Sequence, residues 1–204
     1  MTNSNPGCGP RTAAPRKHTV PDLRARKGTA PLVMVTAYDA PSARIVDDAG
    51  AEIILVGDSL AMVVLGYENT LQVTLDDMVR HTAAVARVKP KALVIADMPY
   101  LSYHTGARDA VLAAGRLVRE GGAEAVKLEG GKKRVEVVRA LSDAEIPVMG
   151  HLGLTPQSLH AMGGYRVQGR ALDEIETLVD DARALVDAGA FSIVLEGMPS
   201  DVAA

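Results

Sequence analysis

The sequence predicts an α/β fold built on a parallel sheet, and within that class it favours a (β/α) barrel. Short apolar runs alternate along the chain with amphipathic helical patterns, which is typical of repeated strand–helix units. A layout of glycine, alanine, apolar run and acid recurs at Gly50, Gly122 and Gly189. No dinucleotide-binding glycine pattern follows the first run, so the barrel is favoured over the alternative, a doubly wound sheet.

Six apolar runs predict the strands. They are short, rich in Val, Ile and Leu, and mostly continuous rather than alternating. Continuous apolar runs indicate parallel strands that are buried on both faces. The runs span residues 31–38, 52–57, 92–99, 125–130, 147–153 and 191–197.

Helical periodicity between these runs predicts five helices. Thr74 is followed three residues later by Asp77, a pattern that resembles a capping box. Glycines after three of the helices, Gly50, Gly121 and Gly189, predict left-handed C-caps. The predicted helices span residues 41–49, 74–88, 107–120, 132–144 and 173–188.

Length and composition indicate one domain with a substantial core. The chain has 204 residues, of which 48% are hydrophobic, but aromatic residues make up only 3%, so aliphatic side chains must fill that core. The lone cysteine, Cys8, excludes a disulfide framework. The longest apolar stretch, residues 60–66, is too short to span a membrane, and no signal peptide is visible. We therefore expect a cytoplasmic protein without a membrane partner.

The N-terminus differs in charge from the rest of the chain. Residues 1–30 carry six Lys or Arg and one acid, whereas the net charge of the whole chain is −3. Residues 1–18 lack an apolar period, which predicts a disordered polar tail followed by a barrel domain over residues 19–204. A nucleic-acid-binding arm is less favoured, because no aromatic residues interleave with the basic ones and the remainder is acidic.

Four carboxylates stand at the ends of predicted strands. They are Asp58, Asp97, Glu129 and Glu196. A charge at such a position is costly to desolvate unless it is paired, metal-bound or solvated. In a barrel the carboxyl ends of the strands meet at one mouth, where the active site lies. Converging oxygen ligands suit Mg²⁺, and no Cys/His cluster suggests zinc. The alternative is that these acids serve as helix caps and salt-bridge partners.

A lysine and a histidine accompany these acids. Lys127 lies two residues before Glu129 on one predicted strand, so both side chains face the same side. Lys127 is interpreted as a salt-bridge partner, a cation for an anionic substrate, or a Schiff-base amine. His151 is either a hydrogen-bonded structural residue or a member of the site. Together these residues indicate a Mg²⁺-assisted reaction on a small anion that passes through an enolate.

The loop over residues 163–169 has no periodicity and is either a lid or a simple connection. Its glycine pair is not a phosphate-binding loop, because the required lysine-containing pattern is absent from the sequence.

At these positions the sequence resembles the ketopantoate hydroxymethyltransferase family. The resemblance covers about residues 20–204. Four motifs carry it in order along the chain: VGDS at 56–59, KLEGG at 127–131, GHLGLTPQS at 150–158 and YRVQGR at 165–170.

The resemblance implies a (β/α)₈ TIM barrel of the phosphoenolpyruvate/pyruvate type and a homo-oligomer, typically a decamer. It implies transfer of a hydroxymethyl group from 5,10-methylenetetrahydrofolate to 3-methyl-2-oxobutanoate through a Mg²⁺-stabilised enolate. The product would be 2-dehydropantoate, in pantothenate biosynthesis. Because the family continues beyond the last residue of this chain, we expect a barrel that lacks its last two strands and leaves the first and sixth as open edges.

The resemblance also implies roles for individual residues. The expected Mg²⁺ ligands are Asp58, Asp97 and Glu129. The expected keto-acid contacts are Asp58, Ser59, Asp97 and Lys127. Glu196 is the expected proton acceptor, and partial burial at the mouth is expected to raise its pKa toward neutrality.

Other functions compete with this one. A Mg²⁺-dependent carbon–carbon lyase or mutase of the same superfamily would share the acids at the strand ends, although the KLEGG and GHLGLTPQS motifs favour the transferase. A class I aldolase would use Lys127 covalently. A truncated chain or pseudoenzyme would have no catalytic activity.

Overall fold

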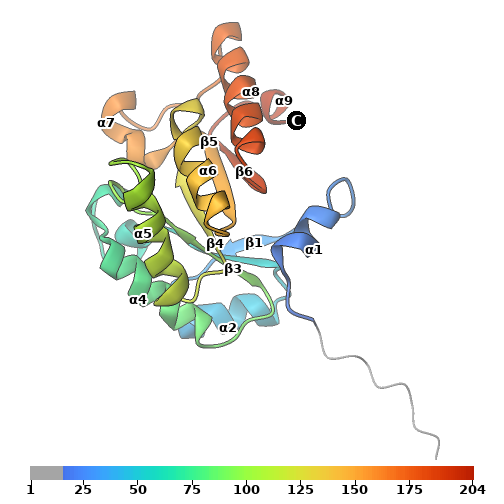
Figure 1. Cartoon of the computed structure of the whole chain (residues 1–204), viewed down its shortest axis with the longest axis vertical. Coiled ribbons are helices and arrows are strands. Elements are labelled where there is room, and N and C mark those ends of the chain that lie inside the picture. Colours follow the sequence, from blue (N-terminus) through green and yellow to red (C-terminus); the bar gives the residue numbers. More distant parts are fainter. Residues whose placement is uncertain (1–15) are drawn as a thin grey trace, which may run out of the picture.

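The computed structural model describes residues 16–204 and contains one curved, six-stranded parallel sheet with helices packed on its outer side (Figure 1). The strands follow one another in chain order, β1-β2-β3-β4-β5-β6, and every neighbouring pair is parallel. This arrangement confirms the prediction of an α/β barrel type. The strands are β1 Met34–Thr36, β2 Ile53–Val56, β3 Leu93–Asp97, β4 Ala125–Glu129, β5 Val148–Gly153 and β6 Ser192–Glu196.

Five longer helices connect successive strands and match the five predicted ranges. They are α2 Ala40–Asp48, α4 Leu75–Ala86, α5 Ala107–Arg119, α6 Val135–Asp143 and α8 Leu172–Asp187. Shorter elements, which helical periodicity did not predict, lie near the strand ends and the termini. These are α1 Val20–Ala25, α3 Leu60–Val63, α7 Leu159–Met162 and α9 Ser200–Ala203, with 3₁₀ turns η1 Thr70–Gln72, η2 Lys132–Arg134 and η3 Pro156–Ser158.

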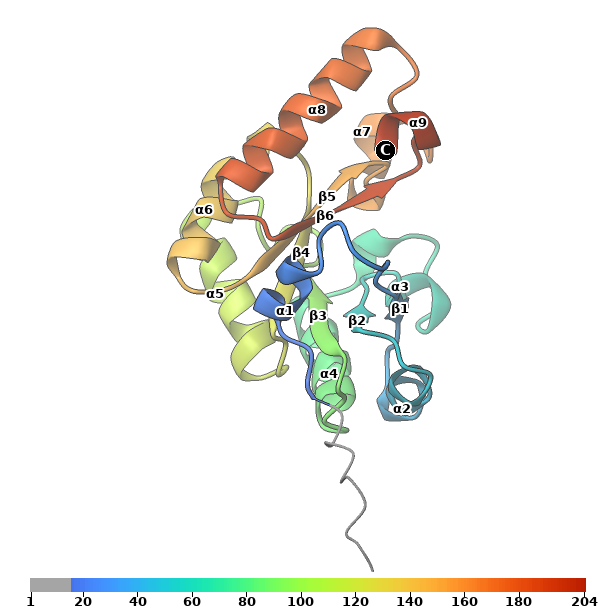
Figure 2. The same cartoon turned by 90° about the vertical axis from the view of Figure 1, so that its right-hand side faces the viewer.

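Both faces of the central strands are buried, as their continuous apolar runs predict. Outward-facing residues such as Ile54, Val94 and Leu128 pack against the helices in a large core. Inward-facing residues such as Leu55 and Ile95 form a second cluster, which Leu23 of α1 joins. Figure 2 shows α1 lying across this inner side of the sheet, beside β3 and β4. Alternation along the strands therefore separates an outer core from an inner face that runs toward the mouth.

The two outer strands are less buried than the others. β1 and β6 stand at opposite ends of the strand order. Met34 and Val35 in β1 and Leu195 in β6 are each exposed by about 40%, whereas all residues of β2 to β5 are buried. The expectation that the first and sixth strands are open edges is confirmed.

Local signals for the helix ends are largely confirmed. The Thr74 hydroxyl accepts a hydrogen bond from the Asp77 N–H at 3.1 Å, and the Asp77 carboxylate accepts one from the Thr74 N–H. Gly50 and Gly189 have the left-handed φ angles of C-caps. At the end of α5, however, the left-handed residue is Gly122 rather than the predicted Gly121. A Cβ on Gly121 would lie 2.5 Å from the Leu117 carbonyl oxygen, so close packing explains that glycine.

The predicted boundary between tail and barrel, at residue 18, lies close to the first residues that the structure describes. Residues 1–15, including Cys8, lie outside the described residues. Lys17, by contrast, reaches the Ala92 carbonyl and the Glu124 carboxylate, each at 2.6 Å, and the His18 N–H donates to the Lys91 carbonyl at 2.8 Å. These contacts attach the chain to the barrel before residue 19. Within residues 16–204, no helix is long and apolar enough to cross a membrane.

Candidate active site

The predicted site residues line one cavity at the carboxyl ends of the strands. This cavity has a volume of about 520 Å³, and its wall also contains apolar side chains such as Met62 and Val194. The structure thus brings together residues that are spread over almost 140 positions of the sequence. The predicted residues that line the cavity are Asp58, Ser59, Asp97, Lys127, Glu129, His151 and Glu196.

Strand register explains why these side chains meet. Neighbouring parallel strands pair Asp97 with Lys127 and Glu129 with His151. On the next strand, Glu196 pairs with Gly153. Side chains two residues apart on a strand share a face, so Lys127 and Glu129 point the same way. Their partners Asp97 and His151 line the same cavity, on the inner side of the sheet. The predicted common orientation of Lys127 and Glu129 is therefore confirmed by this register.

Lys127 forms a buried ion pair with Asp97. Its Nζ lies 2.7 Å from Asp97 Oδ1, and both side chains are no more than 6% exposed. Burial alone would lower the pKa of Lys127, but the carboxylates of Asp97, Asp58 and Glu129 outweigh it and raise the pKa. The salt-bridge interpretation of Lys127 is thus correct, and the ammonium also remains a fixed positive charge at the cavity wall.

Asp58 is the carboxyl group most affected by its surroundings. Burial, followed by repulsion from Asp97, raises its pKa to about 7, with a further contribution from Glu129. Asp58 does not cap the helix that follows it, since Ser59 occupies the N-cap of α3 without a side-chain cap bond. Its backbone N–H instead donates to Asp97 Oδ2 at 3.0 Å. With a pKa of about 7, Asp58 is close to half-protonated at neutral pH.

Ser59 is held toward the cavity by a tyrosine. The Ser59 and Tyr38 hydroxyls lie 2.9 Å apart. Because Tyr38 lies two residues after the end of β1, this hydrogen bond joins the carboxyl ends of β1 and β2. The arrangement leaves a hydroxyl group beside Asp58, where a polar ligand group can be bound.

His151 lies between two carboxylates. Its Nδ1 is 3.5 Å from Glu129 Oε1, and its Nε2 is 3.2 Å from Glu196 Oε2. Burial would lower the pKa of His151, but contact with these two acids raises it. His151 is thus placed in the site by its two contacts rather than in a separate structural position.

The pKa of Glu196 shifts in the direction opposite to the one predicted. Contact with His151 lowers it, and this effect outweighs that of burial. The physical reason is that the Glu196 side chain is 47% exposed, so it is weakly desolvated while it lies against a histidine. Glu196 is consequently ionised near neutral pH, as a proton acceptor must be.

Gln157 and Tyr103 are two polar residues of the site that the sequence did not single out. Gln157 is buried and donates from Nε2 to Asp58 Oδ2 at 2.8 Å, while its backbone N–H donates to Glu129 Oε2 at 3.0 Å. Tyr103 is also buried and donates its hydroxyl to Gln157 Oε1 at 2.6 Å. Gln157 belongs to the GHLGLTPQS motif, but nothing in its local pattern shows that it reaches a strand end 99 residues away.

The donor set of the site fits Mg²⁺. Asp58, Asp97 and Glu129 supply hard carboxylate oxygens, all from buried side chains that line one cavity. A divalent cation would also relieve the repulsion that raises the pKa of Asp58. Residues 16–204 contain no preassembled group of three or more metal-binding side chains. This is compatible with Mg²⁺, which takes one or two carboxylates and completes its shell with water and substrate.

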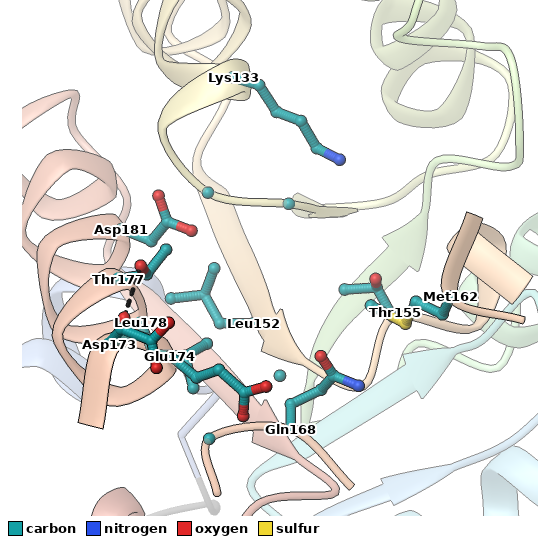
Figure 3. Close-up of a pocket in the computed structure, with 14 residues that line it drawn as sticks. Lys133, Leu152, Thr155, Met162, Gln168, Asp173, Glu174, Thr177, Leu178 and Asp181 are labelled. Carbon is teal, nitrogen blue, oxygen red and sulfur yellow. Dashed lines mark hydrogen bonds between the residues drawn. The ribbon is translucent and has the colours of Figure 1, made fainter. Parts of the chain in front are cut away.

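The loop over residues 163–169 borders two cavities. Tyr165 lines the site cavity, whereas Gln168 and Gly169 line a second cavity of about 290 Å³ between η2 and α8. Figure 3 shows Gln168 extending into this second cavity, with the carboxylates of Glu174 and Asp181 on the α8 side. The Gln168 N–H donates to the Gly197 carbonyl at 2.8 Å, which joins the loop to the end of β6.

Comparison with known proteins identifies strong sequence relatives. The sequence model of one family, ketopantoate hydroxymethyltransferase, matches residues 17–204. A protein of Geobacter metallireducens is 54% identical over 92% of this chain and 71% of its own length. A protein of Moorella thermoacetica is 59% identical over 91% of this chain and 69% of its own length. Both relatives are named 3-methyl-2-oxobutanoate hydroxymethyltransferase.

Solved structures confirm the barrel type. The fold is similar to that of 2,3-dimethylmalate lyase, a member of the PEP mutase/isocitrate lyase superfamily, with a TM-score of 0.65 at 21% identity. It is equally similar, at 16% identity, to phosphonopyruvate hydrolase, whose structure was solved with oxalate and Mg²⁺. These alignments cover 93% and 88% of this chain but only 66% and 63% of the solved chains. At such identities the likeness shows the fold alone.

Proposed function

The chain belongs to the ketopantoate hydroxymethyltransferase family, and from this premise we propose that it transfers a hydroxymethyl group to 3-methyl-2-oxobutanoate, with 5,10-methylenetetrahydrofolate as the one-carbon donor. The product would be 2-dehydropantoate. One observation carries the proposal: a buried cation, three carboxylates and an ionised glutamate line the same cavity.

The buried end of the cavity suits the keto acid. Lys127 contributes a positive charge for the substrate's negative charge, and the Ser59 hydroxyl offers a hydrogen bond beside it. Asp58, Asp97 and Glu129 would hold Mg²⁺. When bound, the ion would supply Lewis-acid stabilisation of negative charge on the keto acid's oxygens.

Glu196 is proposed as the base that removes the proton from C3 of the keto acid. Its lowered pKa keeps it unprotonated near neutral pH, and its partial exposure leaves a carboxylate oxygen accessible to a substrate. His151 Nε2 lies 3.2 Å from one oxygen of the same carboxylate and orients it. The electron pair left on the substrate then forms a new carbon–carbon bond to the methylene carbon of the folate. Over the whole reaction both carbon–nitrogen bonds to this carbon break and a water molecule supplies its hydroxyl group. The proton from C3 and the second proton of the water end on the two nitrogens of the departing tetrahydrofolate.

The charge state of Lys127 disfavours the Schiff-base alternative. A Schiff base requires a neutral amine as nucleophile. The surrounding carboxylates raise the pKa of Lys127, so the amine stays protonated near neutral pH. We therefore assign Lys127 an electrostatic role rather than a covalent one.

The test of this proposal is the exchange of the C3 proton of 3-methyl-2-oxobutanoate in D₂O, measured by NMR with the full chain and Mg²⁺. Glu196→Gln should bind the keto acid, as calorimetry would show, but should lose about 10²–10⁴-fold in exchange rate because it removes the base. Glu176→Gln, on the exposed side of α8, is the matched control and should exchange at the wild-type rate. Wild-type exchange by Glu196→Gln would assign the base to another residue, and no exchange by the unmodified chain would refute the proposed activity of this chain.

Further features implied by the family resemblance stay predictions. They are the decameric assembly, the cytoplasmic location and the contacts to the folate. Light scattering of the purified chain would test the assembly.

A further inference from the structure

We infer that Gln157, with its orientation set by Tyr103, is a positioning residue that presents Asp58 and Glu129 to a divalent cation, each through one oxygen. The inference rests on the proposed Mg²⁺ site, and it adds two residues that contact the expected ligands rather than the ion.

Gln157 binds both carboxylates from one position. Its side-chain Nε2 donates to Asp58 Oδ2 at 2.8 Å and to the Met98 carbonyl at 3.0 Å. Its backbone N–H donates to Glu129 Oε2 at 3.0 Å. The residue is only 6% exposed, so these bonds form away from water, where a hydrogen bond to a charged group is strong. Gln157 therefore links the carboxyl ends of β2, β3 and β4.

Tyr103 determines which way the Gln157 amide points. Its hydroxyl donates to Gln157 Oε1 at 2.6 Å and accepts from the Glu129 N–H at 3.2 Å. Because the backbone N–H of Glu129 can only donate, the tyrosine proton is left for the amide oxygen. The amide nitrogen must then face Asp58. The opposite orientation would place the amide oxygen against the Met98 carbonyl oxygen, with no proton between them.

This network leaves the second oxygen of Asp58 and of Glu129 for another ligand. Gln157 occupies Oδ2 of Asp58 and Oε2 of Glu129, while the Asp58 N–H occupies Oδ2 of Asp97. Glu129 Oε1 is contacted only by His151 Nδ1 at 3.5 Å, whereas Asp97 Oδ1 is paired with the Lys127 ammonium at 2.7 Å. Residues that orient metal ligands in this way typically change metal affinity by about 10–100-fold when mutated.

Gln157→Met tests the inference, because methionine keeps the length of the side chain and removes the amide. Binding of Mn²⁺ to the full chain is measured by electron paramagnetic resonance, where free and bound ions give different signals. We expect the Kd for Mn²⁺ to rise at least about tenfold. The backbone bond from residue 157 to Glu129 remains in this variant, so the change reports on Asp58.

Tyr103→Phe tests the orienting role without altering Gln157 itself. Loss of one hydrogen bond should weaken Mn²⁺ binding about fivefold. In the Gln157→Met background the same substitution should change the Kd by less than about twofold, because the amide that it orients is gone. The control is Thr82→Val, which removes a buried hydroxyl bonded to the Met78 carbonyl within α4 and should lower the melting temperature but leave the Kd unchanged.

The outcomes separate this inference from the proposed function. If the wild-type chain binds Mn²⁺ and both Gln157→Met and Tyr103→Phe bind it within twofold of wild type, the positioning role is refuted while the metal site stands. If the wild-type chain itself binds no Mn²⁺, the proposed metal site fails. Should Gln157→Met not fold, Tyr103→Phe alone decides, since an unchanged Kd in that folded variant overturns the orienting role.

Discussion

Replacing Lys127 with methionine, Lys127→Met, removes a positive charge from among three buried carboxylates. The ammonium lies 2.7 Å from Asp97 Oδ1, with both side chains at most 6% exposed. At an effective dielectric constant of about 20, this attraction amounts to about 6 kcal/mol before desolvation is considered. Because the variant leaves a buried charge without its partner, we expect the free energy of unfolding to fall by about 3–5 kcal/mol at pH 8.

The same variant should recover stability as the pH falls. The pKa of Asp58 is already about 7 in the wild-type protein, and it rises further above its unfolded value when the charge of Lys127 is removed. The folded variant then binds more protons than its unfolded state, so its stability decreases with rising pH across this window. The difference from wild type should therefore be smaller at pH 6 than at pH 8.

Urea unfolding followed by circular dichroism at both pH values measures these effects. Lys132→Met is the matched control, because Lys132 pairs with Asp180 at 2.9 Å but both side chains are more than half exposed. Its loss should cost less than about 1 kcal/mol. A Lys127→Met variant within 1 kcal/mol of wild type at pH 8, or one whose deficit grows as the pH falls, would refute this account of the buried cluster.

Two further predictions concern the scaffold. The pKa of Glu52 is lowered by the Val33 N–H and by Arg26, so its contribution to stability exists above the unfolded pKa of about 4.5 and disappears as the pH falls through the folded value. Glu52→Gln should thus cost about 1 kcal/mol at pH 7 and almost nothing near pH 3 in urea titrations, and an equal cost at both values would contradict the linkage. Gly153→Ala would place a Cβ 2.2 Å from the Glu196 carbonyl oxygen at a φ of +86°, so thermal unfolding should reveal a loss of at least about 1–3 kcal/mol. Gly115→Ala in α5, where a Cβ meets nothing within 4 Å, should stabilise instead, and similar effects of the two substitutions would contradict the steric argument.

Most of the fold was predictable because its signals are local. Continuous apolar runs predicted strands buried on both faces, and β2 to β5 are fully buried. The spacing of Thr74 and Asp77 predicted a capping box that the structure contains. Short elements such as α3 and the 3₁₀ turns were not predicted, because three or four residues carry too little periodicity to be recognised.

The candidate site was predictable in membership but not in its contacts. Acids at strand ends must lie at one mouth once the strands are parallel, so Asp97, Glu129 and Glu196 could be placed there from their positions in the sequence. The Lys127–Asp97 pairing and the His151–Glu196 contact depend on the register between strands, which no single run of residues shows. The pKa of Glu196 was expected to be raised, but it is lowered because Glu196 contacts His151, a neighbour that the sequence alone did not show.

The sequence by itself determined the strand–helix alternation, the strand ends at which charge is placed, and the resemblance to one enzyme family. The spacing of apolar residues shows the alternation, and the residue types at each position show the charged strand ends and the resemblance. Only the tertiary structure decided how the charges are compensated, since Gln157 reaches Asp58 across 99 positions and Tyr103 fixes the direction of that bond. Desolvation and hydrogen bonding depend on neighbours in space, and packing of the strands and loops is what makes such residues neighbours.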